Sequence, residues 1–362
     1  MKTKMLSGVC LLALGAMACG SGVDDAGEAA VAGESQQLTP TFQVDPSWPM
    51  IPNNWVFGIT SGLSIDAANN IWVLHRPRTV PPELAGRAAP PVMVFDTDGN
   101  FVKGWGGPGE GFEWPGTEHG VFVDHNDYVW IAGSGRGDDQ ILKFTSDGEF
   151  VMQIGRAGRS GGNTDTQNVN RAADLYVYPP TNELFIADGY RNRRVVVYDA
   201  ATGEYQRHWG AYGNVPTDDA YTYDPDAEPS QQFGRPVHCA TLSKDGLIYV
   251  CDRVNDRIQV FERNGTFINE VMIAPRTLAF GSAFDVDFSP DTDQKYLYNI
   301  DGMNEKIWVI SRNDLSIVNS VGFGGRQAGG FLHAHSLAVD SHGNIYIGET
   351  LGGNRVQRFV ER

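Results

Sequence analysis

A chain of 362 residues with a formal net charge of −16 can bury a large core, and its acidity excludes a basic surface for nucleic acid or an anionic membrane. Its 43 glycines and 11% aromatic residues suit an all-β fold with many short strands and tight turns. The length exceeds that of a usual single domain, but rings of β-sheets commonly reach it, so one domain suffices.

The N-terminal region predicts export. A positively charged start and a short apolar stretch make residues 1–18 a predicted signal peptide, too short to span a bilayer. Cys19 follows Ala16-Met17-Ala18, which resembles the lipobox of bacterial lipoproteins, so lipid attachment at Cys19 is favoured over plain cleavage. Residues 19–40 are small, acidic and polar and are expected to form a disordered tether. The expected location is the cell envelope, periplasmic or at the outer membrane or cell surface, with a lipid anchor as the membrane attachment.

A β-hairpin pattern recurs along the chain at a period near 50 residues. In the clearest copy, Leu247–Val250 and Arg257–Phe261 alternate apolar and polar residues around the polar turn Val254-Asn255-Asp256. Such a period is typical of propellers with one four-stranded blade per repeat, so residues 41–362 are expected to form one six-bladed β-propeller. In chain order, the six copies lie at Ser61, at His119, around Leu184, at Val237, around Tyr296 and at His335.

The two ends of the repeat region are incomplete in complementary ways. The last copy ends at Val360 with no residues left for a fourth strand, and Thr41–Asp45 is a strand without a neighbour in the sequence. Because an unpaired sheet edge invites aggregation, we predict that Thr41–Asp45 supplies the outer strand of the sixth blade and closes the ring. The fifth copy is the least regular, and its first strand cannot be placed from the sequence.

Three histidines fall at one position of the repeat, in the second, fourth and sixth copies. The first strand of each blade lines the channel of a propeller, so alternate blades would place three imidazoles around the axis. Three imidazoles with a fourth position free are the ligand set of a catalytic zinc, which predicts a zinc site; the alternative is three ordinary polar residues at a channel mouth. The histidines are His119, His238 and His335, each five residues before Asp124, Ser243 and Asp340, respectively.

Three further residues follow the second strand of their blades, beside the same predicted mouth. Arg76 and Arg253 could bind a carboxylate through two parallel hydrogen bonds, and Tyr190 offers a phenolic hydroxyl. Each could instead be a packing or surface residue. Their shared location with the histidines makes them candidates for a substrate site.

One pair of residues leaves its alternatives open. Cys239 and Cys251 are the two cysteines of the repeat region, and in an exported protein they could form a disulfide or remain two buried thiols. The long insertion Ala211–Gln232 is rich in acidic residues and is read as a solvated loop rather than a cation site.

Several short motifs follow one another on the expected blades: His119-Gly120, Asp188–Arg193, Val237-His238, Asp252-Arg253 and His335-Ser336-Leu337. Segments such as Asp252–Phe261 resemble NHL-repeat propellers, and the set of motifs resembles, more specifically, peptidyl-α-hydroxyglycine α-amidating lyases. The resemblance implies a zinc lyase that cleaves the N–C bond of a peptidyl- or acyl-α-hydroxyglycine and releases an amide and glyoxylate. It implies that the three histidines bind the zinc, that Tyr190 is the base, and that Arg76 and Arg253 lie in the substrate site. The resemblance covers roughly Trp55 to Val360.

The chain departs from that family at three positions. Arg191 replaces a family cysteine, His333 replaces a methionine, and Ser336 replaces an aspartate of a structural calcium site, which puts Ca²⁺ in doubt. No copper hydroxylase domain is recognisable, so a hydroxylated substrate would come from elsewhere. The alternatives are a non-enzymatic NHL-propeller binding module and a lactonase-type metal-dependent hydrolase. The expected protein is a monomer that acts on a small molecule or peptide with a carboxylate.

Overall fold

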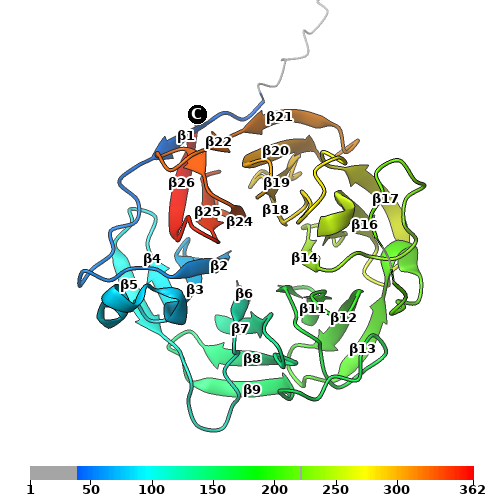
Figure 1. The fold of residues 1–362 in the computed structure, drawn as a ribbon, viewed down its shortest axis with the longest axis horizontal. Coiled ribbons are helices and arrows are strands. Elements are labelled where there is room, and N and C mark those ends of the chain that lie inside the picture. The colour runs from blue at the N-terminus through cyan, green and yellow to red at the C-terminus, as the bar shows by residue number, and fades with distance from the viewer. Residues whose placement is uncertain (1–38, 221) are drawn as a thin grey trace, which may run out of the picture. The chain divides into compact units, whose positions relative to one another are not determined.

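In the computed structural model, which describes residues 39–220 and 222–362, six four-stranded antiparallel sheets form a ring (Figure 1). Residues from the first strands of all six sheets line a cavity at its centre, which we call the channel. The first strand of each sheet lies beside the channel and the last lies at the rim (Figure 1). The predicted six-bladed propeller is therefore confirmed. The predicted signal peptide, Cys19 and the tether as far as residue 38 lie outside the described residues.

The blades follow one another in chain order. Blade 1 contains β2 (Ile59–Ile65), β3 (Ile71–Arg76), β4 (Val92–Phe95) and β5 (Phe101–Trp105), and blade 2 contains β6 (Glu118–Val123), β7 (Tyr128–Gly133), β8 (Gln140–Thr145) and β9 (Phe150–Gly155). Blade 3 contains β10 (Asp174–Tyr178), β11 (Glu183–Asp188), β12 (Arg194–Asp199) and β13 (Tyr205–Trp209), and blade 4 contains β14 (Val237–Leu242), β15 (Ile248–Asp252), β16 (Arg257–Phe261) and β17 (Phe267–Met272). Blade 5 contains β18 (Asp285–Phe288), β19 (Tyr296–Asp301), β20 (Lys306–Ser311) and β21 (Ile317–Val321), and blade 6 contains β24 (Ala334–Val339), β25 (Ile345–Glu349), β26 (Arg355–Glu361) and β1 (Phe42–Asp45).

Short elements connect or flank the blades. The Pro-rich insertion after Arg76 forms two 3₁₀ turns, and a two-stranded parallel sheet precedes blade 6. No helix among the described residues has the length and hydropathy needed to cross a membrane. The short elements are η1 (Pro77–Thr79), η2 (Pro82–Arg87), η3 (Ala211–Gly213), η4 (Arg253–Asn255), β22 (Phe323–Gly324) and β23 (Gly330–Phe331).

The core lies between neighbouring blades, and β15 shows how one strand serves two interfaces. Ile248 and Val250 pack into the cluster shared with blade 3, whereas Tyr249 and Cys251 pack into the cluster shared with blade 5. Successive side chains of a strand point to opposite faces, and here both faces are covered. The middle strands are therefore buried on both sides, which explains their nearly continuous apolar sequences.

The ring is closed by the N-terminal strand, as predicted. β1 pairs antiparallel with β26, with Phe42 opposite Glu361 and Asp45 opposite Arg358. The Phe42 ring also packs edge-on against Tyr298 of blade 5, with ring centres 5.6 Å apart. This strand gives blade 6 its outer edge.

The first strand of blade 5 is β18, the element that the sequence did not reveal. It is four residues long, and its polar side chains, Asp285 and Asp287, alternate with buried Val286 and Phe288. The two carboxylates accept hydrogen bonds from backbone amides of β24 in the next blade, at 3.0 and 2.8 Å. The strand is therefore joined to its neighbour by polar contacts, which hides it from a search for hydrophobic alternation.

The two cysteines of the propeller form a disulfide. Cys239 on β14 lies directly opposite Cys251 on β15, and their Cα atoms are 4.8 Å apart. Of the two alternatives left open by the sequence, the structure shows the disulfide.

Candidate metal centre and substrate site

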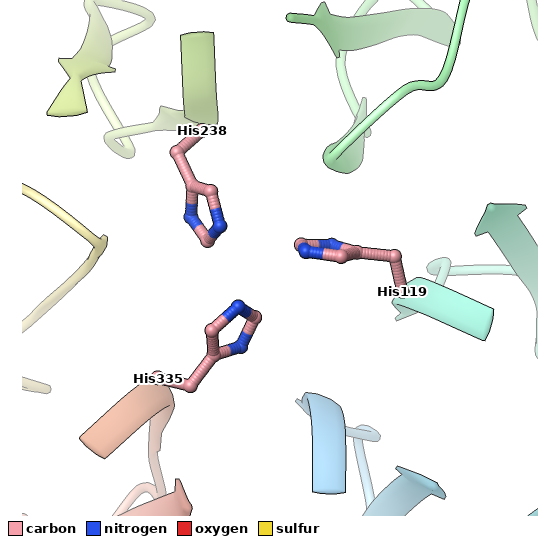
Figure 2. Close-up of side chains that lie close together, drawn as sticks. All are labelled: His119, His238 and His335. Atoms are coloured by element: carbon pink, nitrogen blue, oxygen red, sulfur yellow. The ribbon is translucent and has the colours of Figure 1, made fainter. Parts of the chain in front are cut away.

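The three predicted histidines meet at the channel. His119 lies on β6, His238 on β14 and His335 on β24, and all three are buried. Their rings converge from three sides (Figure 2), and the ligand nitrogens all lie within 4.8 Å of one another. Among residues 39–220 and 222–362, this is the one group of three or more histidine, cysteine or acidic side chains gathered closely enough to hold a metal ion.

Backbone carbonyls of the intervening blades orient the imidazoles. A carbonyl oxygen can only accept a hydrogen bond, so each Nδ1 beside one must carry the proton. The lone pair of each imidazole is therefore on Nε2, the state that a metal ligand needs. The Nδ1 atoms of His119, His238 and His335 donate to the carbonyl oxygens of Ala173, Phe284 and Ser61, at 2.7, 2.5 and 3.0 Å, respectively.

Burial keeps the three imidazoles neutral. It lowers the pKa of His119 to about 3 and holds the pKa values of His238 and His335 well below the usual 6.5. The positive charge of Arg253 lowers all three pKa values further. Three neutral imidazoles with their Nε2 lone pairs at one point fit a divalent metal ion that prefers nitrogen ligands.

Tyr190 lies at the same point. Its hydroxyl is 2.8 Å from Nε2 of His119 and 3.3 Å from Nε2 of His238. The turn after β11 reaches so far inward because Gly189 precedes the tyrosine. A Cβ atom at Gly189 would lie 2.0 Å from the carbonyl oxygen of Val237, so a larger residue would push the turn away from blade 4.

Arg253 and Arg76 bring two positive charges to the site that no carboxylate neutralises. Arg253 is 7% exposed, and its Nη1 lies 3.4 Å from the Tyr190 hydroxyl. Nε of Arg76 donates to the carbonyl oxygen of Glu118 at 2.7 Å, while the Glu118 carboxylate pairs with Arg78. Neither Arg76 nor Arg253 forms an ion pair with another described residue, and desolvation lowers the pKa of each. Arg253 is buried and Arg76 is partly buried, and a desolvated cation without a counter-ion is costly, so this pair favours an anionic ligand.

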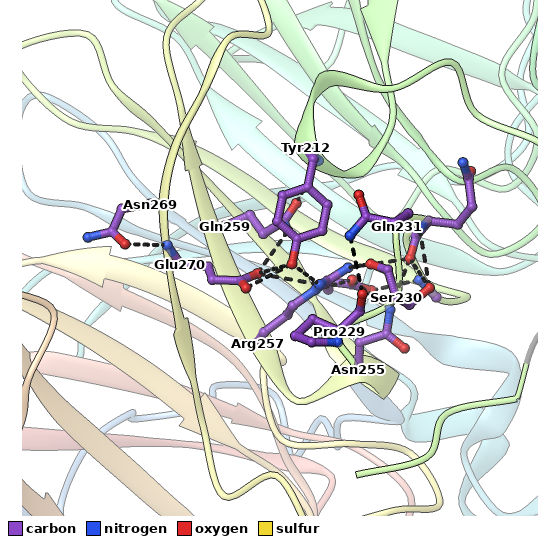
Figure 3. Close-up of polar contacts among 12 residues, drawn as sticks. Tyr212, Pro229, Ser230, Gln231, Asn255, Arg257, Gln259, Asn269 and Glu270 are labelled. Atoms are coloured by element: carbon purple, nitrogen blue, oxygen red, sulfur yellow. Dashed lines mark hydrogen bonds and ion pairs between the residues drawn. The ribbon is translucent and has the colours of Figure 1, made fainter. Parts of the chain in front are cut away.

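Buried acid–arginine pairs fix the turns that carry Tyr190 and Arg253. In blade 4, Nε of Arg257 lies 2.8 Å from Oδ2 of Asp252, directly before Arg253, and the same guanidinium contacts Tyr212 and Ser230 (Figure 3). Blade 3 repeats the pair: Arg194 lies 2.8 Å from Asp188, two residues before Tyr190. The repeat sequence thus places a rigid ion pair directly behind each of these residues.

Phe284 is a part of the site that the sequence did not reveal. Its ring centre lies 5.6 Å from that of His238 and 5.4 Å from that of His333, and the guanidinium of Arg253 stacks on it at 4.8 Å. The residue directly precedes β18, so the unplaced strand concealed it. Knowing the position of β18 would have aligned Phe284 with Ala173, the carbonyl that holds His119.

A carboxylate pair lies next to the histidines. Asp174 and Asp285 line the same small cavity of the channel as the three histidines, and burial and their mutual repulsion raise the pKa of Asp285 well above its usual value. Burial also raises the pKa of Asp174 to about 7. Ser336, whose replacement of a family aspartate puts a structural Ca²⁺ in doubt, lines that cavity too.

Comparison with known proteins gives relatives of two kinds. NHL repeat-containing protein 3 of Mus musculus is 27% identical over 346 residues, which cover 89% of this chain and 84% of that protein. Peptidyl-alpha-hydroxyglycine alpha-amidating lyase 1 of Drosophila melanogaster is 26% identical over 367 residues, which cover 91% of this chain and 61% of that protein. The homologues therefore include NHL repeat proteins and amidating lyases. No protein-family model matches the chain.

Solved structures support the fold. Virginiamycin B lyase from Staphylococcus aureus superposes with a TM-score of 0.51 at 12% identity, over 90% of this chain and 88% of that one. At this identity the likeness concerns the propeller architecture alone.

Proposed function

We propose that the protein is a metal-dependent lyase that cleaves a peptidyl- or acyl-α-hydroxyglycine into an amide and glyoxylate. The observation that carries the proposal is the Tyr190 hydroxyl, which lies within hydrogen-bonding distance of Nε2 of both His119 and His238 and beside Arg253. The homologues named as amidating lyases support a lyase, although the chain matches 61% of the Drosophila protein.

The substrate's charge matches the site. An α-hydroxyglycine carries a carboxylate on the carbon that also bears the hydroxyl and the amide nitrogen. Arg76 and Arg253 would bind this carboxylate, and the two guanidinium charges would then have an anionic partner. Carboxylate binding would place the hydroxyl-bearing carbon beside Tyr190.

Proton transfer by Tyr190 would start the reaction. In this step Tyr190 acts as the phenolate. It takes the proton of the substrate hydroxyl, the C–N bond breaks, and the electron pair of that bond leaves with the nitrogen while the oxygen forms the carbonyl of glyoxylate. Tyr190 then returns the proton to the nitrogen, which leaves as the amide, so the phenolate is restored and no oxidant or water is consumed. A positioned acid–base group typically contributes about 10²- to 10⁴-fold.

We propose zinc as the metal. Three neutral imidazoles are a common set of protein ligands for a catalytic zinc, and zinc supplies Lewis-acid chemistry that lowers the pKa of a bound hydroxyl group. His119, His238 and His335 would hold it.

Metal analysis combined with a glyoxylate assay tests the function. The purified protein is expected to contain one zinc per chain and to release glyoxylate and an amide in equal amounts from N-benzoyl-α-hydroxyglycine. The binding-module alternative draws support from the relatives named only as NHL repeat proteins. A zinc-loaded protein that releases no glyoxylate from any α-hydroxyglycine would favour it. The lactonase-type alternative resembles propellers that hold calcium with Glu, Asn and Asp side chains on the axis, and the three histidines at that position argue against it.

We also propose that the protein is an exported, monomeric lipoprotein anchored through Cys19. The disulfide between Cys239 and Cys251 supports an oxidising compartment. Labelling cells with a fatty-acid analogue should mark the wild-type protein and leave a Cys19→Ser variant unmarked. Equal labelling of both would contradict the anchor.

A further inference from the structure

An apolar loop stands beside the substrate site, between β17 and β18. Leu278 and Phe280, two residues apart in this loop, are each 49% exposed. The ring centre of Phe280 lies 5.8 Å from the guanidinium carbon of Arg253 and 5.8 Å from the ring centre of His333. We call Leu278, Phe280 and His333 the apolar ledge.

The backbone of this loop rests directly on the turn that carries Arg253. Gly281 has a φ of +77°, and a Cβ atom there would lie 1.8 Å from the carbonyl oxygen of Arg253. The loop is closed by hydrogen bonds, including one of 2.8 Å from Gly281 N to the Leu278 carbonyl. Leu278 and Ala279 adopt left-handed conformations, with φ values of 58° and 49°, which non-glycine residues seldom adopt. The loop thus holds Leu278 and Phe280 toward solvent at a conformational cost.

The ledge is continuous with the metal centre. Phe284 contacts His238 and also His333, and His333 contacts Phe280. Arg253 lies over both Phe284 and Phe280, at 4.8 and 5.8 Å. One aromatic wall therefore runs from the buried histidines to solvent, with Arg253 along it and Phe280 at its outer end.

We propose that the ledge binds an apolar group on the acyl side of the substrate, so that aromatic or long acyl chains are preferred to acetyl. The inference rests on the function proposed above and names its substrate class. The acyl carbonyl carbon lies one residue length, about 3.5 Å, from the carboxylate carbon. Because the Phe280 ring centre lies 5.8 Å from the guanidinium carbon of Arg253, an aromatic ring or a chain of several atoms beyond that carbonyl is long enough to reach Phe280 from a carboxylate held by Arg253, whereas acetyl is shorter. Two aromatic rings whose centres lie about 4.5–7 Å apart attract each other, and their contact also removes apolar surface from water.

Binding of unreactive analogues tests the ledge without turnover. N-benzoylglycine and N-acetylglycine share the carboxylate and differ in the acyl group, and calorimetry on the metal-loaded protein measures both. We expect N-benzoylglycine to bind about tenfold more tightly, a difference of about 1.4 kcal/mol. In Phe280→Ala the two probes should bind equally, with N-acetylglycine unchanged. Phe323→Ala is the matched control, because Phe323 on β22 is also 49% exposed, and it should keep the preference.

The outcomes separate the ledge from the lyase. Equal binding of both probes to the wild type, no binding of either, or an equal loss for both in Phe280→Ala would overturn the ledge, even if glyoxylate is released. A benzoyl preference that Phe280→Ala abolishes supports the ledge, even if no α-hydroxyglycine is cleaved. In the second case the lyase proposal fails and the ledge stands.

Discussion

The even-numbered and odd-numbered blades bring different chemistry to one channel. Blades 2, 4 and 6 each supply an imidazole, whereas blades 1, 3 and 5 supply the carbonyls that orient it. The odd blades also carry Tyr190 and Arg76. All six blades share one fold, yet the candidate metal ligands lie on the even-numbered blades and most of the groups that would act on the substrate lie on the odd-numbered blades. Arg253, which follows β15 of blade 4, is the exception.

Removing the hydroxyl of Tyr190, which blade 3 contributes, should have the largest effect on the catalytic rate. Tyr190→Phe is expected to lower kcat with N-benzoyl-α-hydroxyglycine by about 10²- to 10⁴-fold, because the proton acceptor is lost. Zinc content and the free energy of unfolding should stay the same. Tyr205→Phe is the matched control, since Tyr205 also contacts a histidine, His208 at 2.8 Å, on the outer strand of blade 3. Equal rates for Tyr190→Phe and the wild type would show that the tyrosine is not the base.

Blade 6 differs from every other blade because it combines the first strand, β1, with the last strand, β26. We expect the ring to be opened most easily at this contact, since no connecting loop joins the two strands. A chain without residues 39–46 loses β1, whose Phe42 and Val44 pack on the core between blades 5 and 6. We expect the free energy of unfolding to fall by roughly 3 kcal/mol in urea titrations. Deleting residues 20–37 instead should change it little. If both truncations unfold alike, the ring does not depend on β1.

Replacing one histidine of an even-numbered blade should weaken metal binding and leave the fold intact. His238→Ala leaves two imidazoles, and zinc affinity is expected to fall at least 100-fold, more than the loss typical of an outer-shell partner. Competition with a chromophoric chelator measures the affinity. His125→Ala and His342→Ala, at exposed positions outside the trio, should bind zinc like the wild type. Wild-type affinity in His238→Ala would contradict the metal centre.

Asp256 belongs neither to the histidine trio nor to the groups proposed to act on the substrate, so its replacement should affect stability alone. Burial, with Asp301 nearby, raises the pKa of Asp256 from 3.8 to about 7. The folded protein keeps this proton while the unfolded chain releases it, so its stabilising contribution is complete below pH 3.8 and is lost as the pH rises to about 7.

Asp256→Asn should therefore raise the free energy of unfolding at pH 8 by roughly 1–3 kcal/mol, with a smaller gain at pH 5. Asparagine tolerates the left-handed conformation of this residue, whose φ is 53°. Urea titrations at the two pH values measure the difference. A gain that is the same at pH 5 and pH 8 would show that Asp256 does not titrate in this range.

The propeller and the histidine set could be predicted because both depend on positions within a repeat. Alternation in strands such as β15 and the shared position of His119, His238 and His335 are visible in one sequence. Strand β18 could not be predicted because its two aspartates accept hydrogen bonds from the next blade, which leaves only two apolar residues to form an alternating pattern.

Other parts of the site depend on contacts between residues of different blades, and these contacts could not be predicted from a single sequence. The carbonyls that hold the imidazoles belong to any residue type, so nothing marks Ala173 or Ser61. The lack of an ion-pair partner for Arg253 and the contact of Phe280 with it likewise emerge only when blades 4 and 5 lie side by side.

Reconstitution with zinc tests the central claim, that the imidazoles of the even blades form a metal centre that serves Tyr190. The protein is stripped of metal with a chelator, and glyoxylate release from N-benzoyl-α-hydroxyglycine is followed as zinc is added. We predict no activity without metal and a linear rise that saturates at one zinc per chain. Full activity in the stripped protein, or none at one bound zinc per chain, would contradict the claim.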